Sequence, residues 1–144
     1  TEPRLLEWEV GVLEKPWQDN VVAIGNSAGF IDPLEATSLY MTVYSIMNLS
    51  NCILQNRKTE VYNKSMLKVW KECSDFIKCH YMLTKKKDTD FWKYHFDKRD
   101  DYKKIIWDNY LSKGNKFTNL FPSSMWAQLG LYYNEFEYYR PRQT

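Results

Sequence analysis

Hydrophobic and polar positions divide the chain into a strand-like beginning and a long helical remainder. Residues 6–13 alternate between apolar and polar or small side chains, which predicts a half-buried strand. Residues 17–20 have the composition of a turn. Residues 21–24 form a short β-branched run that ends at Gly25, and this run predicts a strand buried on both faces.

After residue 37 the hydrophobic spacing becomes helical. Residues 38–55 carry apolar side chains at steps of three and four, which predicts a helix with one apolar face. The members of that face are Leu39, Val43, Ile46, Leu49 and Ile53. Thr59, with Glu60 in the first turn, opens a second long helix that continues to about residue 82.

The last third of the chain alternates between polar loops and short helical patterns. Residues 85–90 form a charged loop, and the aromatic-rich residues 91–94 are interpreted as a turn. The hydrophobic pattern predicts two further helices, at residues 100–111 and 123–133. A serine at the start of the second would be its N-terminal cap.

The predicted strands are too few to make a complete sheet. They need other strands beside them, so we expect sheet-forming sequence upstream of this chain. The chain also begins at Thr1 without a preceding Met. We therefore expect that its beginning lies elsewhere or was removed.

Composition favours a folded domain. The chain has 144 residues, of which 44% are hydrophobic and 17% aromatic, which excludes a disordered tail. Nothing approaches the roughly 18 apolar residues of a membrane helix, and no signal-like run is present. The net charge of +2 is too small to indicate nucleic-acid binding. We expect a cytoplasmic protein.

Cysteine and histidine spacing argues against a metal site. The three cysteines form no C-x-x-C pair, and two histidines complete no zinc-ligand pattern. Buried free thiols in a reducing compartment are the expected arrangement. The lysine run at residues 85–87 is interpreted as a solvated loop or helix end.

Residues 25–37 have the least ordinary composition. Small residues after a strand let the backbone approach a large flat ligand, and Asn26 offers an amide to a ligand hydroxyl. Glu35 has apolar and small neighbours, and a partly desolvated carboxylate suits a general base. Alternatively, this is an ordinary strand-to-helix crossover with a first-turn carboxylate, and the residues alone modestly favour that interpretation.

Three motifs resemble the flavin-dependent tryptophan halogenase family. Residues 21–38, VVAIGNSAGFIDPLEATS, resemble its flavin-site segment, including the Pro-Leu-Glu-(Ser/Ala)-Thr core. Residues 76–81 and 88–92 resemble its F-x-x-x-H-Y and D-T-x-F-W signatures. The family's G-x-G-x-x-G turn, W-x-W-x-I-P segment and upstream lysine have no counterpart here, and Val12 stands where the family often has Arg.

The resemblance implies a portion of an α/β flavoprotein with the FAD-binding, glutathione-reductase-like fold, in which a few N-terminal strands precede a mainly helical C-terminal region. Residues 1–37 would end the FAD-binding domain and include the strap between the flavin and halide sites. Residues 38–144 would form the helical substrate-side region, and the upstream dinucleotide-binding part would be absent. The implied enzyme uses reduced FAD, oxygen and halide to halogenate an aromatic, indole-like substrate, and this chain alone would be incomplete and inactive.

The family's site residues are transferred here by position. Glu35 matches the catalytic glutamate. The cofactor-binding candidates are Gly25, Asn26, Ser27, Ala28, Gly29 and Ile31. The halide candidates are Thr37 and Ser38, and the substrate candidates are Leu120, Phe121 and Trp126, for which ordinary core packing stays the alternative. No metal is implied.

The implied partners are the missing N-terminal portion of the same enzyme, a separate flavin reductase that supplies reduced FAD, a halide ion and a small aromatic substrate. A homodimer or higher oligomer is possible, whereas neither nucleic acid nor a membrane is expected. Two other functions stay open. One is a related FAD-dependent monooxygenase or reductase, and the other is a non-catalytic helical binding module that retains old motifs.

Overall fold

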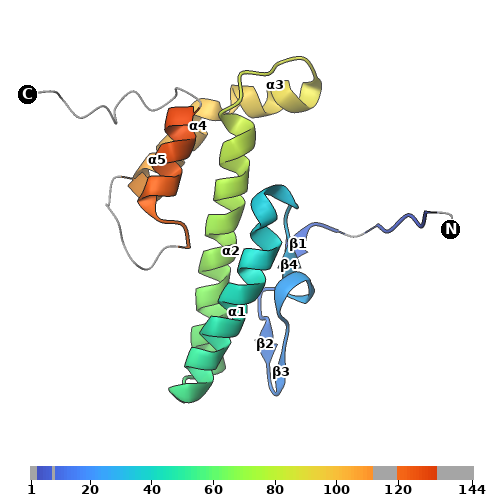
Figure 1. Ribbon diagram of the computed structural model, residues 1–144, viewed down its shortest axis with the longest axis vertical. Helices are drawn as coiled ribbons and strands as arrows, with labels where there is room; N and C mark the ends of the chain where they lie inside the picture. Colours follow the sequence, from blue (N-terminus) through green and yellow to red (C-terminus); the bar gives the residue numbers. More distant parts are fainter. Residues whose placement is uncertain (1–2, 8, 112–119, 133–144) are drawn as a thin grey trace, which may run out of the picture. The chain divides into compact units, whose positions relative to one another are not determined.

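The computed structural model describes residues 3–7, 9–111 and 120–132. The chain divides into two compact units, residues 1–70 and 71–144, and helix α2 (Thr59–Met82) runs from the first into the second. Among these described residues, the first unit contains strands β1 to β4, two 3-10 turns and helix α1, and the second contains helices α3, α4 and α5 (Figure 1).

The strands of the first unit form two antiparallel pairs. Strand β1 (Gly11–Val12) pairs with β4 (Gly29–Phe30), and β2 (Trp17–Gln18) pairs with β3 (Val21–Val22). The predicted strand at residues 6–13 is therefore regular only near its end. The prediction that residues 21–24 are buried on both faces is wrong, because Val21 is 67% exposed and β3 has no other strand partner among the described residues.

The β2–β3 hairpin is closed tightly and attached to α2. Asp19 takes a positive φ of 50° at the hairpin turn. The Trp17 backbone N–H donates to Asn63 Oδ1 at 2.8 Å, and Asn63 Nδ2 donates to the Trp17 carbonyl at 2.9 Å. The Trp17 ring meets the Tyr62 ring edge-on with centroids 5.6 Å apart. One amide side chain thus satisfies both backbone groups of Trp17.

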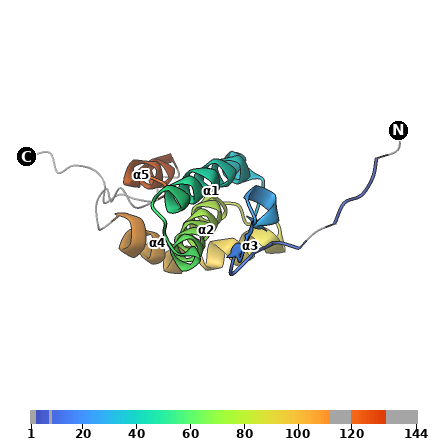
Figure 2. The same ribbon diagram turned by 90° about the horizontal axis from the view of Figure 1, so that it is seen from below.

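The two long helices have nearly the predicted bounds. Helix α1 (Thr37–Leu54) lies alongside the first turns of α2, as Figures 1 and 2 both show. Its apolar stripe, however, faces solvent. The buried side of α1 instead carries Thr37, Met41, Ser45 and Cys52. Periodicity located the helix, but the side of it that packs on this chain carries two hydroxyl groups, a thiol and Met41 instead of the predicted apolar stripe.

The second unit packs around the C-terminal half of α2. Helix α4 (Arg99–Ile106) continues into a π-helical turn, Trp107–Leu111, and α5 spans Ser123–Tyr132. Both agree with the sequence prediction within one or two residues. The expected turn at residues 91–94 is wrong, because α3 (Asp90–Asp97) occupies it. Thr89 Oγ1 accepts from the Trp92 backbone N–H at 3.4 Å, and this N-terminal cap favours a helix over a turn.

The core of the second unit is aromatic. Phe76 stacks on Phe121 with centroids 4.1 Å apart and meets Trp126 edge-on at 5.0 Å. Ile77 and Ile106 are also buried. None of the helices in the described part of the chain is long and apolar enough to cross a membrane.

Candidate functional site

The residues matched to the flavin site form a compact crossover between strands and α1. A 3-10 turn, Gly25–Ser27, leads into β4, and a second 3-10 turn, Leu34–Ala36, leads into α1. Ser27 Oγ donates to the Ile24 carbonyl at 2.8 Å and accepts from the Ile24 backbone N–H at 3.0 Å. These reciprocal bonds hold the first turn closed.

Two glycines of this crossover are required by the fold itself. Gly25 has φ +62°, and a Cβ there would lie 2.6 Å from Thr42 Oγ1 of α1. A Cβ on Gly29 would lie 3.0 Å from Val12 Cγ2 and 3.1 Å from the Gly11 carbonyl oxygen. The sequence led us to expect a ligand close to the backbone at these two glycines. In the structure, α1 lies against Gly25 and β1 lies against Gly29.

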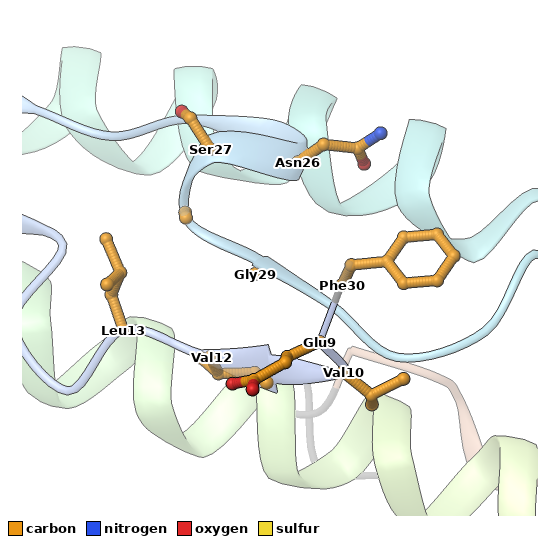
Figure 3. A pocket seen from close by; sticks show the side chains of 10 residues that line it. Glu9, Val10, Val12, Leu13, Asn26, Ser27, Gly29 and Phe30 are labelled. Atoms are coloured by element: carbon orange, nitrogen blue, oxygen red, sulfur yellow. The ribbon is translucent and has the colours of Figure 1, made fainter. Parts of the chain in front are cut away.

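Part of the crossover lines an open groove of about 480 Å³. Its walls are residues 9–13 and residues 26–30, two stretches that lie opposite each other in Figure 3. Asn26 and Ser27 on this wall are exposed, whereas Ala28 and Gly29 are buried. Glu9 is the one charged residue among the lining residues. The groove thus combines backbone, small side chains and a few polar groups.

Residues 31–37 form a strap that its own hydrogen bonds hold in place. Asp32 Oδ1 accepts from the Leu34 backbone N–H at 3.0 Å. Thr37 Oγ1 donates to the Leu34 carbonyl at 2.9 Å and lies 3.3 Å from the Asp32 carbonyl oxygen. Ala36 takes a left-handed backbone with φ 52°, which is costly for a residue with a Cβ. The strap therefore turns sharply just before α1.

The candidate residues of the strap differ in exposure. Thr37 is buried, and Ile31 and Ser38 are partly buried. The Ser38 carbonyl accepts from Thr42 Oγ1 at 2.9 Å. The backbone of Glu35 lies in the second 3-10 turn, but its side chain falls outside the described part of the molecule. The proposed catalytic role of Glu35 therefore stays a prediction.

The substrate candidates Leu120, Phe121 and Trp126 lie in the second unit, where all three are buried. Phe121 and Trp126 belong to the aromatic core around Phe76. Their burial agrees with the packing alternative, and their role toward a substrate stays a prediction.

Sequence reasoning missed Glu72. Its side chain is 2% exposed, and its two carboxylate oxygens accept from the backbone N–H groups of Leu120 and Phe121, each at 2.9 Å. One buried carboxylate thus holds the segment that contains two substrate candidates. The sequence feature that could have identified Glu72 is its position beside the apolar stripe of α2.

The family-like aromatic residues pack together near the end of α2. Tyr81 contacts Phe91 and Trp92 with ring centroids 5.7 and 6.0 Å apart, and the His95 ring stacks on Tyr81 at 5.6 Å. His80 Nδ1 lies 2.9 Å from the Phe76 carbonyl oxygen. These contacts support the interpretation that this signature serves packing between helices.

Burial also shifts the pKa values of two groups in the second unit. It raises the pKa of the Cys79 thiol to about 12, and nearby Asp75 adds to the effect. Burial lowers the pKa of the His95 imidazole, with a smaller contribution from Lys98.

All three cysteines are buried free thiols, as expected. The described residues contain no cluster of His, Cys, Asp or Glu that could hold a metal ion. Lys85–Lys87 are exposed, as predicted for a solvated run.

Comparisons with known proteins give one consistent result. The family model described as tryptophan halogenase matches residues 1–133. The chain is 30% identical over 92 residues to tryptophan 7-halogenase KtzQ of Kutzneria sp. (strain 744), which covers 61% of this chain and 17% of that protein. Tryptophan 7-halogenase RebH of Lentzea aerocolonigenes gives the same identity over the same share of each chain.

A solved structure extends the similarity to the fold. BrvH, a flavin-dependent halogenase from Brevundimonas sp. BAL3, superposes with a TM-score of 0.76 at 26% sequence identity. The match covers 94% of this chain and 29% of that chain. The chain therefore spans about a sixth of the two curated relatives and under a third of BrvH.

Proposed function

Because the chain belongs to the tryptophan halogenase family, we propose that it is part of a flavin-dependent halogenase. This oxidoreductase uses reduced FAD, oxygen and a halide to halogenate an aromatic, indole-like substrate. The observation that carries the proposal is the family match over residues 1–133, because it includes the complete crossover and strap at residues 25–38.

The groove along residues 26–30 is the part of this chain that would hold FAD. Its volume of about 480 Å³ lies in the usual range of roughly 300–1,000 Å³ for ligand pockets. Asn26 would offer its amide to a ligand hydroxyl, and the backbone from Gly25 to Ile31 would lie along the flavin. The groove is open, so it suits one wall of a flavin site whose other walls come from elsewhere. Bound reduced flavin would supply, with oxygen, the oxidising power that converts halide to a halogenating species.

The halide would bind at the start of α1. The Thr37 hydroxyl donates to backbone carbonyls of the strap. The Thr37 backbone N–H also donates to the Leu34 carbonyl. The groups that an anion would use are therefore the backbone N–H groups of the first helical turn after Thr37, beginning with Ser38. An 18-residue helix has the positive end of its dipole at this point.

Glu35 would act on the substrate side of the strap. We assign it the role of a base that takes the proton lost from the ring or assists the family's lysine, which other sequence would contribute. Ala36 and the bonds of Thr37 would fix the direction of the chain immediately after Glu35. The segment with Leu120, Phe121 and Trp126 would lie beside the substrate.

The remaining partners follow from the same proposal. A separate flavin reductase would supply reduced FAD, and the rest of a halogenase would supply the dinucleotide-binding part of the glutathione-reductase-like domain. We place the reaction in the cytoplasm, because three buried free thiols suit a reducing compartment.

The test combines this chain with the part of BrvH that lies outside the aligned 29%, with FAD, a flavin reductase, bromide and indole. Brominated indole is measured by mass spectrometry, and bound flavin by absorbance. Glu35→Gln should reduce bromination by about a hundredfold or more, the usual contribution of a general base, and leave flavin binding intact. The exposed Glu60→Gln is the matched control. Equal bromination by the Glu35→Gln and Glu60→Gln proteins would refute the role of Glu35. Absence of any bromination or flavin binding would refute the proposed function.

A further inference from the structure

Glu72 is a buried carboxylate that binds two consecutive backbone amides. Its side chain is 2% exposed, and its oxygens Oε2 and Oε1 accept from the N–H groups of Leu120 and Phe121, each at 2.9 Å. Successive N–H groups converge on one anion where the backbone turns, because an extended chain directs them to opposite sides. The carboxylate therefore fixes both the position and the local conformation of this segment.

Burial alone does not explain a carboxylate at this position. Removing a carboxylate from water is costly, whereas an apolar side chain in the same place would contribute to the core. Cys73 and Phe76, the next residue of α2 and the residue one turn further along, are both buried and apolar. What Glu72 adds, and an apolar side chain cannot, is a pair of directed hydrogen-bond acceptors. Its contribution is the geometry of the segment that it holds.

The held segment begins the part of the chain that contains all three substrate candidates. We call residues 120–126, which run into α5, the α5 entry. Phe76 stacks on Phe121 of the α5 entry with centroids 4.1 Å apart, and it meets Trp126 edge-on at 5.0 Å. Glu72 and Phe76, one turn apart on α2, thus act on the same segment. The carboxylate holds its backbone, and the ring holds two of its side chains.

We propose that Glu72 is a positioning residue for the aromatic substrate. Through its two hydrogen bonds it sets the place of the α5 entry, and with it the side chains that contact the substrate. This inference rests on the proposed function and adds a residue that lies outside the family-like signature, which begins at Phe76. Glu72 acts through the segment and not on the ring, because its carboxylate is buried against the two amides. Loss of its bonds should therefore weaken substrate binding more than the chemical step.

The experiment compares substrate kinetics in the assembled enzyme, which is this chain with the part of BrvH outside the aligned 29%, FAD, a flavin reductase and bromide. Brominated indole is measured over a range of indole concentrations, which separates the KM for indole from kcat. Glu72→Gln keeps the size of the side chain but offers one acceptor oxygen instead of two. Glu72→Asp keeps the charge and both oxygens but is shorter by one methylene.

Leu83→Ala is the structural control. It removes a buried apolar side chain of the same unit, and its loss of core packing should lower stability as the Glu72 variants do. Leu83 lies beside Tyr102 and Ile106 of α4 and is eleven residues from Glu72 along the sequence. A change in KM that follows from general loss of stability would therefore appear in this variant as well. Circular dichroism checks that each chain is folded before the assay.

We expect Glu72→Gln to raise the KM for indole by about tenfold or more and to leave kcat within about threefold of the wild type. Glu72→Asp should raise KM by a smaller factor, about threefold, because the charge and both acceptors remain. Leu83→Ala should keep KM within about twofold of the wild type, since it leaves the hydrogen bonds to the α5 entry in place.

Equal KM values for Glu72→Gln and Leu83→Ala would overturn the inference, and so would a fall in kcat alone. If Glu72→Gln does not fold, the same comparison is decided by Glu72→Asp. Loss of the fold in both would also overturn the inference, because the carboxylate would then serve the whole unit and not one segment. A wild type that brominates nothing would refute the proposed function and the positioning role with it. A wild type that brominates, with variants that share its KM, would refute the positioning role alone.

Discussion

The carboxylate of Glu72 should be a large single contributor to the stability of the second unit. It is 2% exposed and accepts two backbone hydrogen bonds, from Leu120 and Phe121, each at 2.9 Å. Glu72→Gln keeps the size of the side chain but replaces one acceptor oxygen by an NH₂ donor. That donor would face a backbone N–H group, which would be left buried without an acceptor.

The magnitude follows from the two bonds. A hydrogen bond to a charged group contributes about 1.5–3 kcal/mol, and a buried unsatisfied donor costs about 1–3 kcal/mol. Relief from burying the charge offsets part of this loss. We expect the free energy of unfolding to fall by about 2–3 kcal/mol. At this chain length that corresponds to a decrease in Tm of roughly 6–10 °C.

The assay is urea unfolding followed by tryptophan fluorescence, with hydrogen exchange at individual amides. The matched control is Glu60→Gln on the same helix, where an exposed first-turn carboxylate contributes below about 1 kcal/mol. Exchange should accelerate at the amides of Leu120 and Phe121 in Glu72→Gln alone. A stability loss no larger than that of the control, or unchanged exchange at these two amides, would show that the carboxylate is dispensable.

Three further predictions concern the backbone, pH and thiol reactivity. Gly25→Ala should lower the free energy of unfolding by about 2–4 kcal/mol, because φ +62° and a 2.6 Å approach to Thr42 Oγ1 both oppose a Cβ. Gly11→Ala, with nothing within 4 Å, should be near neutral, and equal urea midpoints for the two variants would contradict the reasoning. The lowered pKa of His95 means that the unfolded chain binds the proton more tightly. Stability from this group is therefore complete above about pH 6.5 and is lost as pH falls below it. Unfolding measured from pH 5 to 8 should show that slope, and His95→Gln should flatten it. The raised pKa of Cys79, about 12, keeps the thiol protonated at pH 8. Iodoacetamide should modify it at least roughly a hundredfold more slowly in the folded than in the urea-unfolded chain. Mass spectrometry that finds Cys79 alkylated at equal rates in both would exclude this burial.

Helix positions were predictable from the sequence because periodicity and start signals act locally. Thr59, with Glu60 in the first turn, gave the start of α2, and the same periodicity gave its end. The strand predicted at residues 6–13 is paired at Gly11–Val12, because its partner β4 is itself two residues long. The turn expected at residues 91–94 became α3 because the Thr89 cap outweighed the aromatic run.

The site was predictable only in part. Its motif located the crossover and strap, but the two glycines serve contacts with α1 and β1 that spacing alone does not reveal. The outward face of α1 depends on which side of the helix meets this chain, which periodicity leaves undetermined. Glu72 was missed because its partners lie 48 and 49 residues away in sequence.

The pairing of Asn63 with Trp17 also decides how the hairpin can grow. An unprotected sheet edge invites another strand, whether native or from an aggregating neighbour. Here a side-chain amide imitates such a strand and occupies both backbone groups at Trp17. A further strand could therefore pair with this sheet only along its other edge, the one formed by Val21 and Val22 of β3.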